Sequence, residues 1–442
     1  MTSIPAIARA LQSTLLTVPA ELERATGYCR RVSKLTGSAF VQTLVFGWLA
    51  EPAASLQALC QVAADVGVTV SPQGLDQRFG PASAALLQAV LETALERVVA
   101  SEPVAVALLQ RFPAVFLLDS TTITLPDPLA EVWVGCGGHW ARTSRAALKA
   151  TVRLDLVTGR LEGPLLSAGR APDQTSPAQH WPLPAGALRI GDLGFWRLDV
   201  LAEIRAQQAH FLSRLHVQTV VFRAGERTRL DLEDWLACQS DDALELDVEL
   251  GQHARIPARL LALRVPTAVA ATRRTTIRTD ARRNHQSPSQ RNLARADWTL
   301  LVTSVPAAEL AVGEAAVLLR ARWQIELLFK LWKSAGGLTS WRSRNPDRIL
   351  CEVYAKLLAM VLQHWLLLTG GWQTPARSLP RLAHTIRTHL ILLFAVLGRL
   401  RALTATLHRL AAALARLRPS DRRRRHPSTA QLLQKPDLSR LA

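Results

Sequence analysis

Cysteine is scarce in this chain of 442 residues, which contains only five. They lie far apart in the sequence, are odd in number and form no Cys-x-x-Cys pair. This pattern excludes a disulfide-stapled scaffold and a zinc site built on paired cysteines. A chain of this kind is typical of a reducing compartment, so we expect a cytoplasmic protein.

Long uninterrupted apolar runs are also missing. The N-terminal stretch carries Glu21 and Glu23 and has no extended apolar core, so we expect no signal peptide. Residues 357–372 are apolar, but Gln363 and His364 interrupt them. This run is too short and too polar for a membrane span and fits a buried helix, so we expect no membrane partner.

Acidic residues are the minority charge, with 35 Asp and Glu against 53 Lys and Arg and a formal net charge of +18. A chain this basic is typical of a protein that binds a polyanion, because neutralising phosphates releases condensed counterions. The alternative is a generally basic composition rich in arginine. Hydrophobic residues make up 49% of the chain, and its length exceeds that of one average domain.

Residues 1–105 show helical patterns. Within residues 54–79, an apolar helical stripe ends at Gly67, and Ser71-Pro72 then begins a second helix. This arrangement resembles a helix-turn-helix, although an ordinary helical hairpin fits the same pattern. We predict an N-terminal helical, helix-turn-helix-like DNA-binding domain over residues 1–105. The polar residues on its second helix are Gln73, Gln77 and Arg78.

Strand patterns begin at residue 114. Apolar runs at 114–118 and 187–190 predict buried strands, which end next to Asp119 and Gly191-Asp192. The remaining elements are an alternating, half-buried strand at 148–156, its hairpin partner at 161–166, a helix at 198–207 and a strand at 211–215. This order is that of an RNase H-like fold, in which Asp119 and Asp192 occupy the places of the first two acids.

A β-rich insertion is predicted at about residues 216–297, with strands at 244–250 and 259–265. Residues 273–295 carry seven arginines and one acid among small polar residues. We expect this stretch to be a mobile loop that orders on phosphates, with a solvated linker as the alternative. Another strand follows at 298–305.

One helix predicted near residues 319–333 has an unusual polar face. Arg322 and Glu326 are i, i+4 neighbours, Lys333 lies two turns beyond Glu326, and Lys330 flanks the same stripe. The opposite face is apolar. A salt-bridged surface facing solvent is the simpler interpretation of the spacing alone.

Three motifs in this order resemble the insertion-sequence-four family of bacterial DDE transposases. The resemblance covers residues from about 40 to 365. In that family a Tyr stands three residues before the Arg, where this chain has Leu319. The motifs are Asp119-Ser120-Thr121-Thr122, Gly191-Asp192-Leu193-Gly194-Phe195 and Arg322-x3-Glu326-x6-Lys333.

The predicted fold class is α/β, with the helical domain over residues 1–105 and an RNase H-like catalytic domain over residues 106–368. The β-rich insertion interrupts the catalytic domain, and a C-terminal helical, Arg-rich region follows over residues 369–442. Within that region, Arg422–Arg425 could hold nucleic acid or keep the end of the chain in solution.

The chemistry predicted for Asp119, Asp192 and Glu326 is metal binding. Carboxylate oxygens are preferred ligands of Mg²⁺ or Mn²⁺, and two such ions about 3.5–4 Å apart activate an attacking oxygen and stabilise the departing one. We predict that Asp119 bridges the two metals and that each of the other acids holds one. Taken singly, Asp119 could be a strand-end turn residue and Glu326 a salt-bridge partner.

Contacts with DNA phosphates are predicted for three cations. Arg322 would bind through its planar guanidinium, and Lys333 and Lys330 through their ammonium charges. The resemblance also implies that Trp298 receives a base flipped out of the duplex, while a core tryptophan is the alternative.

The function predicted from these residues and the resemblance is DNA transposition. The protein would bind the inverted repeats at the ends of its element, cleave them and join the 3′-hydroxyl ends to target DNA. The resemblance implies a hairpin intermediate, a homodimer on DNA and a place at the bacterial nucleoid. The alternatives are a non-catalytic DNA-binding repressor and a stand-alone metal-dependent nuclease.

Overall fold

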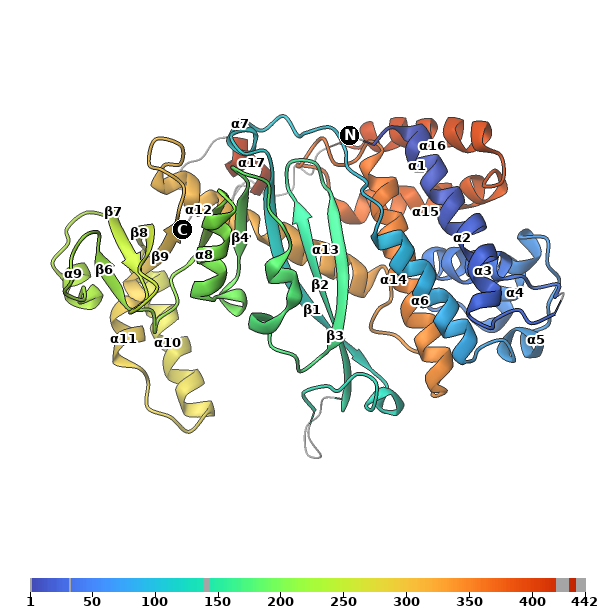
Figure 1. Ribbon diagram of the computed structural model, residues 1–442, viewed down its shortest axis with the longest axis horizontal. Helices are drawn as coiled ribbons and strands as arrows, with labels where there is room; N and C mark the ends of the chain where they lie inside the picture. The colour runs from blue at the N-terminus through green and yellow to red at the C-terminus, as the bar shows by residue number, and fades with distance from the viewer. Residues whose placement is uncertain (1, 32, 138–143, 419–428, 435–442) are drawn as a thin grey trace.

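The computed structural model describes residues 2–31, 33–137, 144–418 and 429–434, so Arg422–Arg425 lies outside the described residues. Its centre is one nine-stranded sheet with the strand order β3-β2-β1-β4-β5-β9-β8-β7-β6 (Figure 1). The strands are β1 Val115–Leu125, β2 Ala146–Asp155, β3 Leu161–Ala168, β4 Leu188–Gly191, β5 His210–Arg214, β6 Val221–Arg223, β7 Ala243–Leu250, β8 Ile256–Arg264 and β9 Trp298–Thr303.

The sheet contains both parallel and antiparallel strands. Strands β1, β4 and β5 are parallel, β2 and β3 form an antiparallel hairpin beside β1, and β9 is antiparallel to β5. Strands β6–β8 lie beyond β9 and extend the same sheet. Leu118 pairs with Gly191. Asp119 and Asp192, the next residues along two parallel strands, are therefore level with each other.

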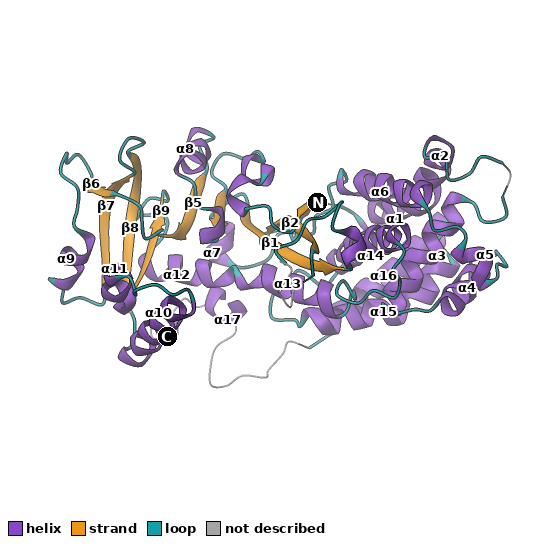
Figure 2. Ribbon diagram, turned by 90° about the horizontal axis from the view of Figure 1, so that it is seen from below, coloured by secondary structure: helices purple, strands orange, loops and turns teal. Residues whose placement is uncertain are grey.

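Helices gather at both ends of this sheet (Figures 1 and 2). The N-terminal helices pack with α14–α16 at one end, and α9–α11 lie at the other. The α-helices are α1 Ile4–Gln12, α2 Val18–Ala25, α3 Gly37–Ala50, α4 Leu56–Asp65, α5 Pro72–Asp76, α6 Pro81–Leu95, α7 Ala107–Gln110, α8 Leu198–Ala206, α9 Leu232–Ala237, α10 Thr267–Arg283, α11 Gln290–Ala294, α12 Val312–Ala321, α13 Trp323–Ser334, α14 Pro346–Leu368, α15 Leu379–Ala395, α16 Leu400–Ala415 and α17 Thr429–Gln434.

Helix α14 is the core helix predicted from the apolar run. The Asn345 side chain caps it by accepting a hydrogen bond from the Arg348 N–H, and Pro346 occupies its first turn. It is long and apolar enough to cross a membrane, but 94% of its most apolar stretch is buried inside the protein. Burial against α3 and α6 explains why the helix is apolar almost all round.

Two strand predictions were wrong in detail. β1 continues six residues past Asp119, because it pairs with β2 as far as Leu125. β2 is buried on both faces rather than half-exposed. Its Arg153 side chain pairs with Glu162 on β3 and donates hydrogen bonds to the Trp181 and Pro182 carbonyls of the 173–183 segment, which covers the polar face. Local alternation could not reveal this covering segment.

The Arg-rich stretch was predicted as a mobile loop and is instead largely helical. Helix α10 covers residues 267–283, and only Ala270 on it is buried. It lacks an apolar stripe, which is why the hydrophobic pattern gave no helix signal. Side chains tie its first turns to β9: Arg273 donates to the Trp298 carbonyl and to Thr299 Oγ1, and Arg274 pairs with Asp297.

The helix-turn-helix prediction is met only in outline. Helix α4 ends at a turn in which Gly67 has φ +88°, and Ser71 caps α5 as expected. However, α5 has five residues. Arg78 follows it and is half-buried against Tyr28 rather than fully exposed. DNA binding by this region remains a prediction.

Candidate active site

A cavity of about 360 Å³ brings six of the seven predicted site residues together. They come from β1, from the turn after β4, and from α13 and the junction before it, which are far apart in the sequence. Its lining residues are Asp119, Ser120, Thr121, Asp192, Arg322, Glu326, Phe329, Lys330 and Lys333. The predicted juxtaposition of two aspartates, one glutamate and three cations is therefore present in the structure.

The Asp119 side chain is 15% exposed, less than that of Glu326 at 28%. Its Oδ1 accepts the backbone N–H of Ser120 at 2.8 Å, and its Oδ2 lies 2.9 Å from an Arg322 nitrogen. Burial raises the pKa of the Asp119 carboxyl to about 6. The Ser120 and Arg322 contacts oppose this shift in pKa, whereas the charges of Asp192 and Glu326, which line the same cavity, add to it.

Arg322 stands between two of the acids. One terminal nitrogen pairs with Asp119, and the other lies 2.7 Å from Glu326 Oε1. The predicted single helix is interrupted here: the Arg322 N–H donates to the Leu319 carbonyl, and the Ile325 N–H to the Arg322 carbonyl. These tight i, i−3 bonds join α12 to α13 and set the direction of the Arg322 side chain.

Asp192 begins the short 3₁₀ turn after β4, and its side chain makes no capping hydrogen bond to that turn. Within the described residues, no three His, Cys, Asp or Glu side chains are grouped closely enough to hold a metal ion in their present positions. The donor types and their shared cavity suit a hard divalent cation. The Arg322 guanidinium, itself a cation, lies between Asp119 and Glu326.

The two lysines on α13 differ in environment. Lys330 is exposed and lies 3.9 Å from the centre of the Trp323 ring, which is 42% exposed. Lys333 is partly buried, and burial lowers the pKa of its ammonium group. Behind them Ile325, Leu328 and Trp332 are buried, as predicted for the apolar face.

Trp298 does not line this cavity. Its ring is 6% exposed, packs in the core between the sheet and α8–α9, and is covered by the Arg264 guanidinium at 4.3 Å. This burial agrees with the alternative of a core tryptophan, and a base-receiving role for Trp298 remains a prediction. Cross-strand pairing of Trp298 with Arg264 explains the burial, and single-strand patterns do not reveal cross-strand neighbours.

Two polar residues beside the cavity, Asp173 and Lys149, were not predicted from the sequence. Asp173 accepts a hydrogen bond from Ser120 Oγ at 2.7 Å and pairs with Lys149 at 3.0 Å. Asp173 belongs to the connection between β3 and β4, and Lys149 to β2. The adjacent Ser120 was part of a recognised motif, but nothing in the spacing pointed to its partner.

The comparison with protein families shows the family to which the chain belongs. The Transposase DDE domain family matches residues 110–362, more than half of the chain and the part that contains all three acids. The chain belongs to this family. The family membership confirms the predicted resemblance to DDE transposases and makes transposition the broad function, with DNA as the partner.

The chain is also similar to several transposases of bacterial insertion sequences. The transposase for insertion sequence element IS231F of Bacillus thuringiensis subsp. israelensis is 26% identical over 364 residues, covering 77% of this chain and 75% of the relative. The transposase of IS231B from subsp. berliner is 25% identical with the same coverage. The putative transposase InsL for IS186A of Escherichia coli (strain K12) is 30% identical over 188 residues, 40% of this chain and half of the relative.

Proposed function

We propose that the chain is a DNA transposase that cleaves the ends of its element with divalent metal ions and joins the free 3′-hydroxyls to target DNA. The observation that carries this proposal is the single cavity lined by Asp119, Asp192 and Glu326 together with Arg322, Lys330 and Lys333. The acids suit metal ions and the cations suit phosphates, so the cavity fits a phosphodiester and the reagents that cut it.

The three acids that line the cavity are the residues that would hold Mg²⁺ or Mn²⁺. When bound, two such ions supply an activated oxygen nucleophile and stabilise the oxygen that leaves. Arg322 pairs with both Asp119 and Glu326 in the free protein and offsets part of their negative charge. Cations bound by these acids would replace that charge, and the guanidinium would become available for a DNA phosphate.

The cations complete the proposed site. Lys333 lines the cavity in a partly buried position, where a fixed positive charge has few waters to screen it. Lys330 lies at the exposed rim beside Trp323. We assign Lys333 and Arg322 to phosphates near the cleaved bond, and Lys330 to the flanking backbone.

We further propose that β1–β5 form an RNase H-like core within residues 106–368. The order β3-β2-β1-β4-β5 and the strand directions support this assignment. Residues 216–297 are then an insertion that lengthens the sheet. Residues 1–105 would bind the end repeats, and residues 369–442 would support the core. A hairpin intermediate, a homodimer on DNA and a nucleoid location complete the proposal.

The experiment that tests this function uses the purified protein, Mg²⁺ and linear DNA that carries the inverted repeats flanking its own gene. We expect nicks at the repeat ends, hairpin-ended fragments and then products joined to a second DNA. Binding without cleavage would indicate a repressor, and cleavage without joining a nuclease. Either result would overturn the proposal.

A further inference from the structure

Asp173 lies between the two segments that carry Asp119 and Asp192. On one side its Oδ1 accepts a hydrogen bond at 2.7 Å from Ser120 Oγ, on the residue that follows Asp119. On the other side its carboxylate faces Gly194, where an added Cβ would lie 3.2 Å from Asp173 Oδ2. One half-buried carboxylate therefore bonds to the segment that carries Asp119 and lies close beside the turn that carries Asp192.

Lys149 fixes the orientation of this carboxylate. Its Nζ lies 3.0 Å from Asp173 Oδ1 and donates a 2.5 Å hydrogen bond to the Ala171 carbonyl. The Lys149 side chain is 12% exposed, and the Asp173 side chain 25%. Because Lys149 and Ser120 contact the same Asp173 oxygen, the two β-strand residues together hold Oδ1 in place.

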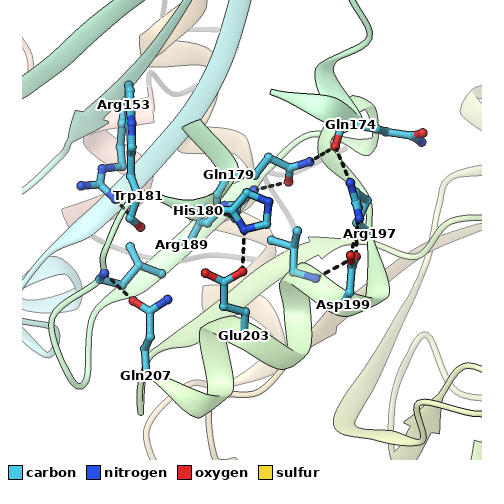
Figure 3. A network of polar contacts seen from close by, with 12 residues as sticks. Arg153, Gln174, Gln179, His180, Trp181, Arg189, Arg197, Asp199, Glu203 and Gln207 are labelled. Carbon is cyan, nitrogen blue, oxygen red and sulfur yellow. Dashed lines mark hydrogen bonds and ion pairs between the residues drawn. The ribbon is translucent and has the colours of Figure 1, made fainter. Parts of the chain in front are cut away.

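A buried arginine anchors the backbone of the same segment to β4. Arg189 is 5% exposed and donates to the main-chain carbonyl of Gln179 at 3.0 Å and to its Oε1 at 2.8 Å. The Gln179 amide nitrogen in turn donates to the Gln174 carbonyl at 2.7 Å. Figure 3 follows these contacts from Arg189 through Gln179 to Gln174, the neighbour of Asp173. The anchored strand is the one that ends before Asp192.

We propose that Asp173 is a positioning residue for the three-acid cavity, acting through Ser120 and through the turn at Gly194. It sets the spacing between Asp119 and Asp192, and Lys149 keeps it in place. This inference rests on the proposed function. Residues that orient metal ligands through hydrogen bonds typically affect metal affinity or activity by about 10–100-fold when they are replaced.

The test replaces Asp173 with Ala and uses Asp127→Ala as the matched control. Asp127 lies two residues after the end of β1. Like Asp173, it accepts a hydrogen bond from a serine hydroxyl, Ser144 Oγ at 2.8 Å, but it does not line the cavity. We expect Asp173→Ala to weaken Mn²⁺ binding, followed by electron paramagnetic resonance, by about 10–100-fold. DNA affinity without metal should stay within about twofold of wild type, and Asp127→Ala should match wild type in both measurements.

Ser120→Ala removes the same hydrogen bond from the other side and avoids leaving Lys149 without a partner. We expect it to weaken Mn²⁺ binding and slow single-turnover cleavage in the same direction as Asp173→Ala. Because both act through one contact, the double variant should lose less than the product of the two single losses. Wild-type Mn²⁺ affinity in both single variants, or independent losses in the double variant, would overturn the positioning role.

The Mn²⁺ measurement separates this inference from the proposed function. If the wild-type protein binds Mn²⁺ but cuts no DNA, the proposed function fails while the positioning role is still measured by binding. If the wild type cuts DNA and Asp173→Ala cuts and binds Mn²⁺ equally well, only the positioning role fails.

Discussion

The two ends of the nine-stranded sheet use positive charge in different ways. In the β1–β5 part, Arg322 is paired with Asp119 and Glu326, and Lys149 with Asp173, all of them partly or largely shielded from water. At the other end, α10 carries arginines that face solvent on a helix with a single buried residue.

The cations behind the net charge of +18 therefore fall into two groups, paired and exposed. Paired cations near the cavity organise carboxylates, and their loss should alter the chemical step. Within the described residues, the exposed arginines on α10 are mostly not paired with carboxylates. They are therefore available to phosphates and should control the affinity for DNA. The predictions below separate these two roles.

The largest expected effect is on cleavage. Asp119→Ala, Asp192→Ala or Glu326→Ala should each abolish single-turnover cleavage of end-containing DNA, because each removes a proposed metal ligand and no phosphate contact. DNA binding should persist or become slightly tighter. Asp247→Ala, an exposed acid on β7 at the other end of the sheet, is the control and should cut normally. Wild-type cleavage by any of the three variants would remove that acid from the site.

The next effect concerns Trp298. Its ring is buried under Arg264, so Trp298→Ala should lower the free energy of unfolding by roughly 3–5 kcal/mol, as expected for a large core side chain. Denaturant unfolding measures this change. A folded, stable variant that nicks normally but fails to form hairpins would instead support the flipped-base role, with Arg264 moving off the ring when DNA binds.

Acid should destabilise the end of the molecule that carries the cavity. His364 on α14 is buried, its Nε2 contacts the Gly159 carbonyl in the β2–β3 turn, and burial lowers the pKa of its imidazole to about 4. Below about pH 6.5, His364 binds a proton in the unfolded chain but stays neutral in the native protein. Stability should therefore fall between about pH 6.5 and 4, by on the order of 3 kcal/mol, and this contribution should level off below pH 4.

His364→Gln should remove this part of the pH dependence, whereas His408→Gln, at an exposed position on α16, should keep it. Urea unfolding of the three proteins at pH 7 and pH 4.5 makes the comparison. An equal loss of stability in all three would show that other groups cause the acid sensitivity.

The exposed arginines of α10 should govern the salt dependence of binding. If six to ten phosphates are contacted, DNA affinity should fall by a factor on the order of 10³–10⁵ between 50 and 200 mM salt. Replacing Arg278, Arg282 and Arg283 with Gln should reduce the slope of log affinity against log salt by about 2 to 3. Cleavage at saturating DNA should be unchanged.

The control replaces Arg399, Arg401 and Arg416, which are exposed on and beside α16 at the opposite end of the molecule. That variant should keep the wild-type slope. Equal slopes in all three proteins would mean that α10 does not contact DNA.

The smallest effect concerns Leu319, which stands where the family has a Tyr. Leu319 is half-buried against the core, one helical turn before Arg322. A Tyr hydroxyl there could donate to a DNA phosphate, and a hydrogen bond to a charged group is worth roughly 1.5–3 kcal/mol. Leu319→Tyr should therefore speed hairpin formation or joining by about tenfold or more on a pre-nicked end. An equal or slower rate would mean that this position serves the core.

Much of the sheet and of the candidate site was predictable because its signals are local. Apolar runs located the first part of β1 and most of β4. The acids that follow the two runs, Asp119 and Asp192, were assigned to the site from the order of the strands. Helical spacing put Arg322 beside Glu326, and the apolar run at residues 357–372 located the buried helix α14. These features depend on the periodicity of one element and on the order of elements.

The rest depended on contacts between elements. The polar face of β2, the burial of Trp298 and the partnership of Asp173 with Ser120 arise from segments that meet only in the fold. Helix α10 has neither an apolar stripe nor a single buried face, so side-chain ties to β9 rather than periodicity hold it. The pairing of Arg322 with two acids rather than one likewise required the distance between β1 and α13.

The most direct test of the central claim is to map where a metal binds. Fe²⁺ added to the purified protein with ascorbate and peroxide generates radicals that cut the polypeptide beside the bound ion. The account predicts cuts near residues 119, 192 and 326 together, suppressed by excess Mg²⁺ and lost in Asp119→Ala. Cuts confined to one of these segments, or unchanged in the Asp119 variant, would contradict a metal site shared by the three acids.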